Sequence, residues 1–288
     1  MKRLINLELT PYCPAKCSMC PRDLIKEFGY MSLETAQTIR EQIQNIDDIW
    51  EISFAGRGEP TLHKNFSEIM KIFSGTKPIS VVTTGANLND SILDAFNKYV
   101  DRIRISVSSV DRETFEKIHV NLNYDKVFEN INRIIENVDK DKIIIHLVGG
   151  ETVYPKVPET VEYLRERGIK NIYIFPLWNR GGTKEQHAEM MKRKKIIDEY
   201  NLKPSEEEYL PTEFDASMLG NDYCLIGDLS LSINFKGEIT CCFQDFGYSE
   251  IVGTVFNNDI KTIFENRSRV LGRMKMCNKC NSKISVIR

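Results

Sequence analysis

The chain has 288 residues, of which 39 are Lys or Arg and 41 are Asp or Glu, so its net charge at pH 7 is −2. A charge so near neutrality excludes the broad basic field that binds nucleic acid or anionic lipid. The first residues, MKRLINLELT, are too polar for a signal peptide, and no stretch approaches the roughly 20 apolar residues that span a bilayer. We therefore expect a cytoplasmic protein whose partners include neither nucleic acid nor a membrane.

Short β-branched runs alternate with amphipathic stretches up to about residue 178. Strands are predicted at Leu4–Leu9, Trp50–Ala55, Ile79–Thr83, Arg102–Val107, Ile143–Val148 and Asn171–Phe175. Helices are predicted between them at Ser32–Ile46, Asn65–Ser74, Asp90–Lys98, Asp111–Lys117, Tyr124–Asn137 and Pro158–Arg167. Repeated strand–helix units imply a parallel sheet with right-handed crossovers, and six units rather than eight predict an α/β fold of the partial (β/α)6 TIM-type barrel class.

The rest of the chain has a different pattern. A charged helix is predicted at Lys184–Tyr200, with its basic run KRKK, 192–195, on the solvated face. The run LSLSINFKGEITCCF predicts a hairpin that turns at Lys236 and Gly237, and a helix at Ile260–Leu271 leads to the final CNKC. We therefore divide the chain into a barrel, 1–182, a helix and linker, 183–222, and a small C-terminal hairpin-plus-helix domain, 223–288.

Eight cysteines fall into two groups that lie about two hundred residues apart. In a reducing compartment, clustered cysteines bind metal or do redox chemistry more often than they form disulfides. The first group, Cys13, Cys17 and Cys20 in CPAKCSMC, follows the first predicted strand, at the sheet edge where such folds bind ligands. Thiolates suit iron–sulfur clusters and zinc, and three of them leave one coordination position for another ligand. A zinc site with a distant fourth ligand and a set of unrelated thiols are the alternatives.

The spacing Cys13-x3-Cys17-x2-Cys20 after the first strand of a partial barrel resembles the radical S-adenosylmethionine (SAM) superfamily. The resemblance implies that these cysteines hold a [4Fe–4S] cluster whose fourth iron binds SAM. It also implies that one electron from the reduced cluster cleaves SAM to a 5′-deoxyadenosyl radical, so that the cofactors carry the radical chemistry.

A second motif supports this resemblance. FAGRGEP, 54–60, resembles the family's Gly-Gly-Glu element, which binds the SAM amino group; Gly58 and Glu59 match it, whereas Arg57 replaces its first Gly. Glycine permits close backbone approach to a ligand. The resemblance also implies SAM contacts from residues at strand ends and beside the third cysteine: Met19, Thr84, Ser106 and Ser108. Hydroxyls at strand ends are otherwise common turn formers.

The second cysteine group resembles the C-terminal twitch domain of some radical SAM enzymes, a reduced form of the SPASM domain. The resemblance implies an auxiliary [4Fe–4S] cluster with four cysteine ligands, namely Cys224, Cys242, Cys277 and Cys280. Cys241 can replace Cys242 in this set, and a four-cysteine structural zinc is the alternative.

Two short stretches resemble the 2-deoxy-scyllo-inosamine dehydrogenases, which oxidise a secondary alcohol in aminoglycoside biosynthesis. These are NRGG, 179–182, and CFQDF, 242–246. The resemblance implies substrate contacts from Arg180, Gln244 and Asp245. Gln244 stands where those enzymes carry an acidic residue, which puts the same amino-sugar substrate in doubt. An ordinary loop arginine and a turn-forming aspartate are the structural alternatives.

Together these patterns predict a radical SAM oxidoreductase. It would abstract a hydrogen from a small polar substrate, such as an alcohol of a sugar or an aminocyclitol, and the auxiliary cluster would accept an electron. A flavodoxin or ferredoxin would supply electrons. The alternatives are a maturase that modifies a short peptide of the RiPP class, a glycyl-radical or sulfatase-type activating enzyme and, from another class, a non-catalytic zinc-binding interaction protein.

Overall fold

The computed structural model describes residues 3–178, 190–204, 230–240, 242–266, 277, 279 and 280. Within these residues one sheet has the strand order β10-β9-β8-β1-β2-β3-β4-β5-β6-β7. Neighbours from β8 through β1 to β7 are parallel, and β9 and β10 add antiparallel pairs. The strands are β1 (Arg3–Leu7), β2 (Ile49–Phe54), β3 (Ile79–Thr83), β4 (Arg102–Ser106), β5 (Ile143–Val148), β6 (Asn171–Phe175), β7 (Lys203–Pro204), β8 (Ser230–Ile233), β9 (Glu238–Thr240) and β10 (Ile251–Thr254). The predicted partial TIM-type barrel is confirmed.

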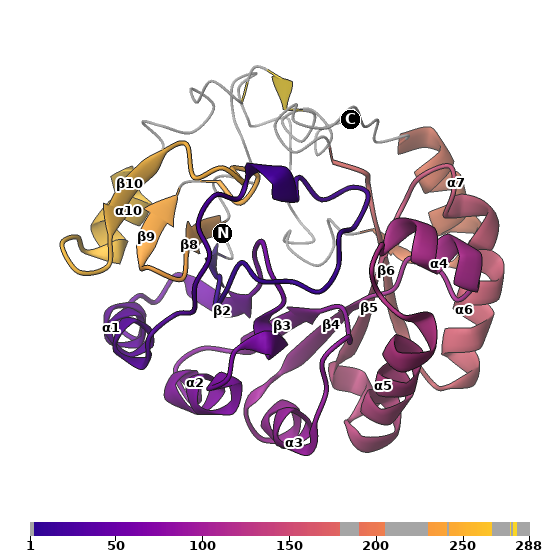
Figure 1. Ribbon diagram of the computed structural model, residues 1–288, viewed down its shortest axis with the longest axis horizontal. Helices are drawn as coiled ribbons and strands as arrows, with labels where there is room; N and C mark the ends of the chain where they lie inside the picture. The colour runs from indigo at the N-terminus through magenta and orange to yellow at the C-terminus, as the bar shows by residue number, and fades with distance from the viewer. Residues whose placement is uncertain are drawn as a thin grey trace.

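The helices cover the outer side of this curved sheet, from α1 round to α7 (Figure 1). They are α1 (Leu33–Ile43), α2 (Phe66–Phe73), α3 (Asp90–Tyr99), α4 (Arg112–Ile118), α5 (Tyr124–Asn137), α6 (Val157–Glu166), α7 (Met190–Tyr200) and α10 (Ile260–Asn266), with 3-10 turns at Arg22–Leu24, Pro60–Leu62, Lys140–Lys142 and Tyr154–Lys156. Polar caps set several starts, because the side chains of Ser32, Asn89, Asp111 and Asn123 each accept a backbone N–H of the first helical turn.

The two faces of the sheet differ in polarity. Apolar residues of the strands, such as Ile52 and Phe54, are fully buried in one cluster with helix residues such as Phe73. Successive side chains of a strand point to opposite faces, so the alternate positions, among them Asn6, Ser53, Ser80, Arg104 and His146, face the barrel interior. The interior is therefore polar, which suits a polar ligand better than an apolar one.

An ion pair lies within this polar face. Arg104 donates two hydrogen bonds, of 2.8 and 3.1 Å, to the two carboxylate oxygens of Glu51, and both side chains are fully buried. Arg102 and Ser80 also donate to this carboxylate, at 3.0 and 2.7 Å. The burial of so many polar groups is tolerated because each finds a partner in the network.

The C-terminal hairpin extends the barrel sheet rather than standing apart from it. Strand β8 pairs in parallel with β1, from Leu4 opposite Ser230 to Leu7 opposite Ile233. The side chain of Gln42 on α1 also donates to the Val255 carbonyl at 2.6 Å. Strand β8 of the predicted C-terminal domain thus belongs to the same sheet as the barrel strands, and the domain bounds remain a prediction.

The prediction that the basic run 192–195 is solvated is wrong at one position. Arg193 is 3% exposed, and its Nε and Nη2 donate to the Ile174 carbonyl at 3.0 and 2.8 Å. This arginine therefore anchors α7 to the end of β6, while Lys192 and Lys194 are exposed. In the described part of the chain, no helix is long and apolar enough to cross a membrane.

Candidate active site

The three cysteines of the first group lie on the loop that follows β1, and all three are half-buried. This loop reaches the end of α4, where Lys16 N donates to the Val120 carbonyl at 2.7 Å and Ser18 N donates to the Ile118 carbonyl at 2.9 Å. Figure 1 shows the loop, in indigo, running across the mouth of the curved sheet. These two backbone bonds, on either side of Cys17, therefore hold the loop at the carboxyl edge of the barrel.

Burial is the main cause of the raised pKa values of two of these thiols. The pKa of Cys13 rises to about 11, with the Glu59 charge as the second cause. The pKa of Cys17 rises to about 12, and there the neighbouring Cys13 and Cys20 add to the effect of burial. A buried thiolate is costly unless a cation binds it, and coordination to iron supplies that compensation. The donor set thus fits an iron–sulfur cluster. Among the described residues, no three His, Cys, Asp or Glu side chains converge closely enough to hold a single metal ion.

His119, directly after α4, contacts this loop. Its Nδ1 lies 3.4 Å from the Cys17 Sγ, and its Nε2 lies 3.0 Å from the Ser108 Oγ. The ring is 2% exposed, and burial lowers the pKa of His119 to about 4. Burial thus favours the neutral imidazole over its charged form.

The turn after β2 packs directly on the cysteine loop. Glu59 N donates to the Tyr12 carbonyl at 2.8 Å. A Cβ on Gly58 would lie 2.0 Å from the Thr10 carbonyl oxygen and 2.6 Å from that of Tyr12, so only glycine fits between these backbones. Gly58 therefore lets the turn pack on the cysteine loop, and its contact with SAM remains a prediction.

The carboxylate of Glu59 is 1% exposed and is bound by neighbouring threonines. Its Oε1 accepts from Thr61 N, Thr61 Oγ1 and Thr83 Oγ1 at 3.2, 2.7 and 2.8 Å. Its Oε2 accepts two bonds of 2.7 Å from Thr84 N and Oγ1. Glu59 therefore joins the turn after β2 to the end of β3, and the Thr84 hydroxyl is engaged in that link.

The other predicted SAM contacts are distributed around the same edge. Met19 and Ser106 are half-buried, whereas Ser108 is 1% exposed and bonded to His119. Their contact with SAM remains a prediction.

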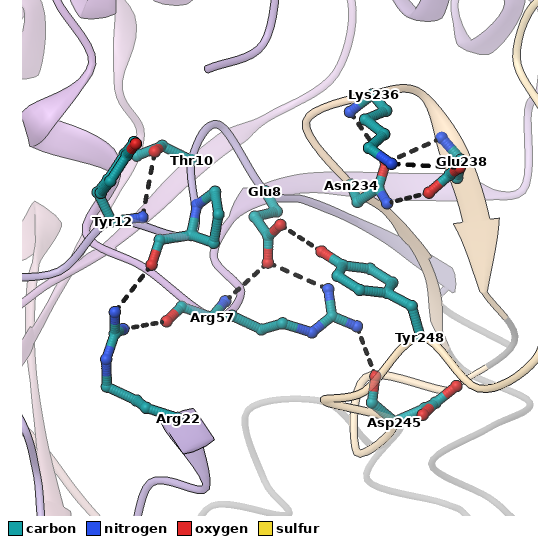
Figure 2. Close-up of polar contacts among 11 residues, drawn as sticks. Glu8, Thr10, Tyr12, Arg22, Arg57, Asn234, Lys236, Glu238, Asp245 and Tyr248 are labelled. Carbon is teal, nitrogen blue, oxygen red and sulfur yellow. Dashed lines mark hydrogen bonds and ion pairs between the residues drawn. The ribbon is translucent and has the colours of Figure 1, made fainter. Parts of the chain in front are cut away.

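Arg57, the residue that departs from the family element, is the centre of a buried network (Figure 2). Its backbone N and its Nη1 each donate to the Glu8 Oε2 at 3.1 Å, and the two side chains are 5% and 4% exposed. Its guanidinium carbon lies 3.1 Å from the centre of the Tyr248 ring, and Tyr248 donates its hydroxyl proton to Glu8. Burial, followed by the Glu8 charge, raises the pKa of Tyr248 far above its usual range, so the phenol remains a donor.

The same arginine reaches the segment after Cys242. Its Nη2 donates to the Asp245 carbonyl at 2.5 Å, and Asp245 N in turn donates to the Cys242 carbonyl at 3.1 Å. The Asp245 carboxylate is turned toward its own loop, where it accepts from Ser249 Oγ at 3.0 Å and Glu250 N at 3.1 Å. Gln244 is 1% exposed. These contacts support the turn-forming alternative for Asp245.

The second cysteine group is described in part. Cys242, Cys277 and Cys280 are half-buried, and Cys280 N donates to the Cys277 carbonyl at 3.3 Å. Cys224, Cys241 and Arg180 lie outside the described residues. The ligand set of the auxiliary cluster thus stays a prediction.

Sequence reasoning did not single out Glu8, His119 or Tyr248. Each lies outside the quoted motifs, and each reaches the site through a partner distant in sequence: Glu8 and Tyr248 bond across 240 positions, and Cys17 and His119 across 102. The one local signal was that His119 follows a predicted helix after the fourth strand.

Known proteins share both the sequence pattern and the fold. A probable GTP 3′,8-cyclase of Saccharolobus islandicus is 25% identical over 205 residues, and the match covers 69% of this chain but 66% of that protein, just under two thirds. The structure of BtrN in complex with AdoMet and 2-DOIA is 18% identical, with a TM-score of 0.63, over 98% of this chain and 93% of that one. Streptococcus suis SuiB bound to the precursor peptide SuiA is 14% identical, with a TM-score of 0.73, over 99% and 71%.

The family model of the radical SAM superfamily matches residues 7–164, more than half of the chain. This stretch contains the cysteine loop, the turn at Gly58 and His119. The chain therefore belongs to the radical SAM superfamily.

Proposed function

We propose that this radical SAM enzyme dehydrogenates a small polar substrate, such as an alcohol of a sugar or an aminocyclitol. In this proposal Cys224, Cys242, Cys277 and Cys280 hold an auxiliary [4Fe–4S] cluster that accepts one electron. The observation that carries it is the direct link from the turn at Gly58 to the segment after Cys242, through the Arg57 bond to the Asp245 carbonyl. An electron acceptor has to lie near the substrate radical. This bond joins the segment after Cys242 to the turn that would bind SAM.

The chain's own residues would bind the cofactors and orient the substrate. Cys13, Cys17 and Cys20 would hold the first cluster, and the turn at Gly58, which packs on their loop, would bind SAM beside it. When bound, the reduced cluster and SAM supply a 5′-deoxyadenosyl radical that takes a hydrogen atom from carbon. The substrate then loses a proton and an electron, so that it ends two electrons more oxidised. The polar interior of the barrel favours a hydroxylated substrate over an apolar one.

Arg180 would orient the substrate oxygen. Arginine stays protonated, so this residue stabilises negative charge rather than abstracting a proton. Gln244 and Asp245 would act through the shape of the loop after Cys242, since both are buried. A flavodoxin or ferredoxin would reduce the first cluster.

The match with probable GTP 3′,8-cyclases favours a second candidate, the ring closure of a nucleoside triphosphate. It differs from dehydrogenation in electron balance, because ring closure without net oxidation leaves the product with the mass of its substrate. The likeness to SuiB keeps peptide modification as a third candidate.

A substrate panel with product masses tests the proposal. Anaerobic enzyme, SAM and dithionite would be incubated with aminocyclitols and sugar alcohols, with GTP, and with short peptides, and each mixture would be analysed by mass spectrometry for 5′-deoxyadenosine and product. We expect a product two hydrogens lighter from a hydroxylated substrate. Conversion of GTP at unchanged mass, with no oxidation of any alcohol, would overturn the dehydrogenase assignment.

Two cysteine variants test whether the first cluster cleaves SAM and the auxiliary cluster accepts the electron. Cys17→Ala should abolish SAM cleavage, whereas Cys280→Ala should retain abortive cleavage while product is lost. Equal loss of both activities in Cys280→Ala, with the first cluster intact by absorption and iron content, would contradict the electron-acceptor role.

A further inference from the structure

The side chain of His119 lies between the Ser108 hydroxyl and the sulfur of Cys17, a proposed cluster ligand. Its backbone N donates to the Phe115 carbonyl at 2.7 Å, and its ring packs on the Phe115 ring with centroids 4.7 Å apart. The residues on either side of it, Ile118 and Val120, accept the backbone bonds from the cysteine loop. The imidazole is thus fixed relative to that loop by main-chain contacts on both sides.

The hydrogen bonds of His119 decide which ring nitrogen carries its proton. A neutral imidazole has one N–H and one acceptor nitrogen. The thiolate of an iron-bound Cys17 has no proton to donate, so a bond at the 3.4 Å contact requires the proton on Nδ1. The Nε2 must then accept, and the Ser108 hydroxyl at 3.0 Å can donate to it. One tautomer therefore satisfies both contacts.

We propose that His119, oriented by Ser108, donates a hydrogen bond to the Cys17 sulfur and thereby raises the reduction potential of the SAM-binding cluster. Such bonds stabilise the reduced cluster more than the oxidised one, because reduction adds negative charge to the sulfurs. His119 is in this sense a positioning residue that acts through Cys17. The inference rests on the first cluster alone and does not depend on the substrate or on the auxiliary cluster.

The test is a redox titration of the reconstituted full-length enzyme, followed by EPR, in which the signal that SAM perturbs identifies the first cluster. His119→Leu keeps the side-chain volume and removes the donor, and it should shift the midpoint potential to a more negative value. His119→Gln, whose amide can donate, should recover part of the shift, and Ser108→Ala should give a smaller negative shift. An unchanged potential in His119→Leu with full cluster content would overturn the proposal.

His63→Leu is the matched control. His63 is also buried, at 3% exposure, but its Nε2 bonds the Met31 carbonyl instead of a cysteine. Its substitution should leave the potential unchanged; a shift equal to that of His119→Leu would show that loss of any buried imidazole suffices, and would refute the specific role.

If the His119 variants do not bind iron, a second measurement on the unmodified enzyme tests the hydrogen bond between His119 and Cys17. With histidine labelled by ¹⁵N, ENDOR of the reduced first cluster should show coupling to a histidine nitrogen and to an exchangeable proton that disappears in D2O. The absence of both couplings in enzyme that contains the cluster would contradict the proposed bond.

Discussion

Replacement of Arg57 by methionine should destabilise the folded protein severely. The substitution keeps much of the side-chain volume but leaves the Glu8 carboxylate buried without its cation, and the two side chains are only 5% and 4% exposed. Removing one partner of a buried pair costs about 3–5 kcal/mol. Loss of the guanidinium contact with Tyr248 places Arg57→Met toward the upper end of that range.

A double-mutant cycle distinguishes the loss of the Arg57–Glu8 ion pair from a general loss of stability. Arg57→Met and Glu8→Leu should each lower the free energy of unfolding by about 3–5 kcal/mol. The double variant should lose less than the sum of these two losses, because it leaves neither charge buried without its partner. Urea denaturation under anaerobic conditions, followed by far-UV circular dichroism, measures each value. Arg112→Met is the control, since its ion pair with Asp125 is exposed and its loss should change little. A loss in Arg57→Met no larger than that in Arg112→Met, or strict additivity in the cycle, would show that the buried ion pair does not stabilise the fold as proposed.

Three further predictions concern the cysteine loop and its neighbours. Gly58→Ala should lose about 1–3 kcal/mol of stability together with SAM affinity, measured by urea denaturation and isothermal titration, because its Cβ would meet the Thr10 carbonyl; unchanged affinity would contradict this. Glu59→Gln should cost about 1–3 kcal/mol by the same denaturation assay, because an amide nitrogen cannot accept the two Thr84 bonds; parent-like stability would contradict it. In iron-free protein at pH 8, iodoacetamide should modify Cys13 about a hundredfold more slowly than an ordinary thiol, since its pKa is about 11 rather than 9.0. The rate, followed by peptide mass spectrometry, should rise with pH toward that value, and a rate that is flat with pH would contradict the burial argument.

Local signals predicted the barrel well. Three of the six predicted strands, at Ile79–Thr83, Ile143–Val148 and Asn171–Phe175, have the observed bounds. Their β-branched residues bury against helices, and α3, α4 and α5 begin at polar caps, so propensity, capping and packing agree in much of this part of the chain. The position of the cysteine loop at the carboxyl end of β1 followed from the parallel order of the strands.

Long-range contacts could not be predicted in the same way. The pairing of β8 with β1 joins segments more than two hundred residues apart, and a hairpin pattern does not specify its neighbour. Arg193 looked solvated because its neighbours are charged, yet the end of β6 offers a carbonyl that its guanidinium can reach. For Arg57 the motif showed only a departure from glycine, and its role depends on Glu8 and Tyr248, which no local pattern connects.

We propose that the two cysteine groups hold two [4Fe–4S] clusters in this radical SAM enzyme. The most direct measurement is the iron, sulfide and zinc content of anaerobically reconstituted protein, combined with an assay for 5′-deoxyadenosine formed from SAM and dithionite. We expect about eight irons and eight sulfides per chain, as two [4Fe–4S] clusters require, with 5′-deoxyadenosine produced. Stoichiometric zinc, little sulfide and no cleavage of SAM would show that both cysteine groups bind zinc and that the chain is not a two-cluster enzyme.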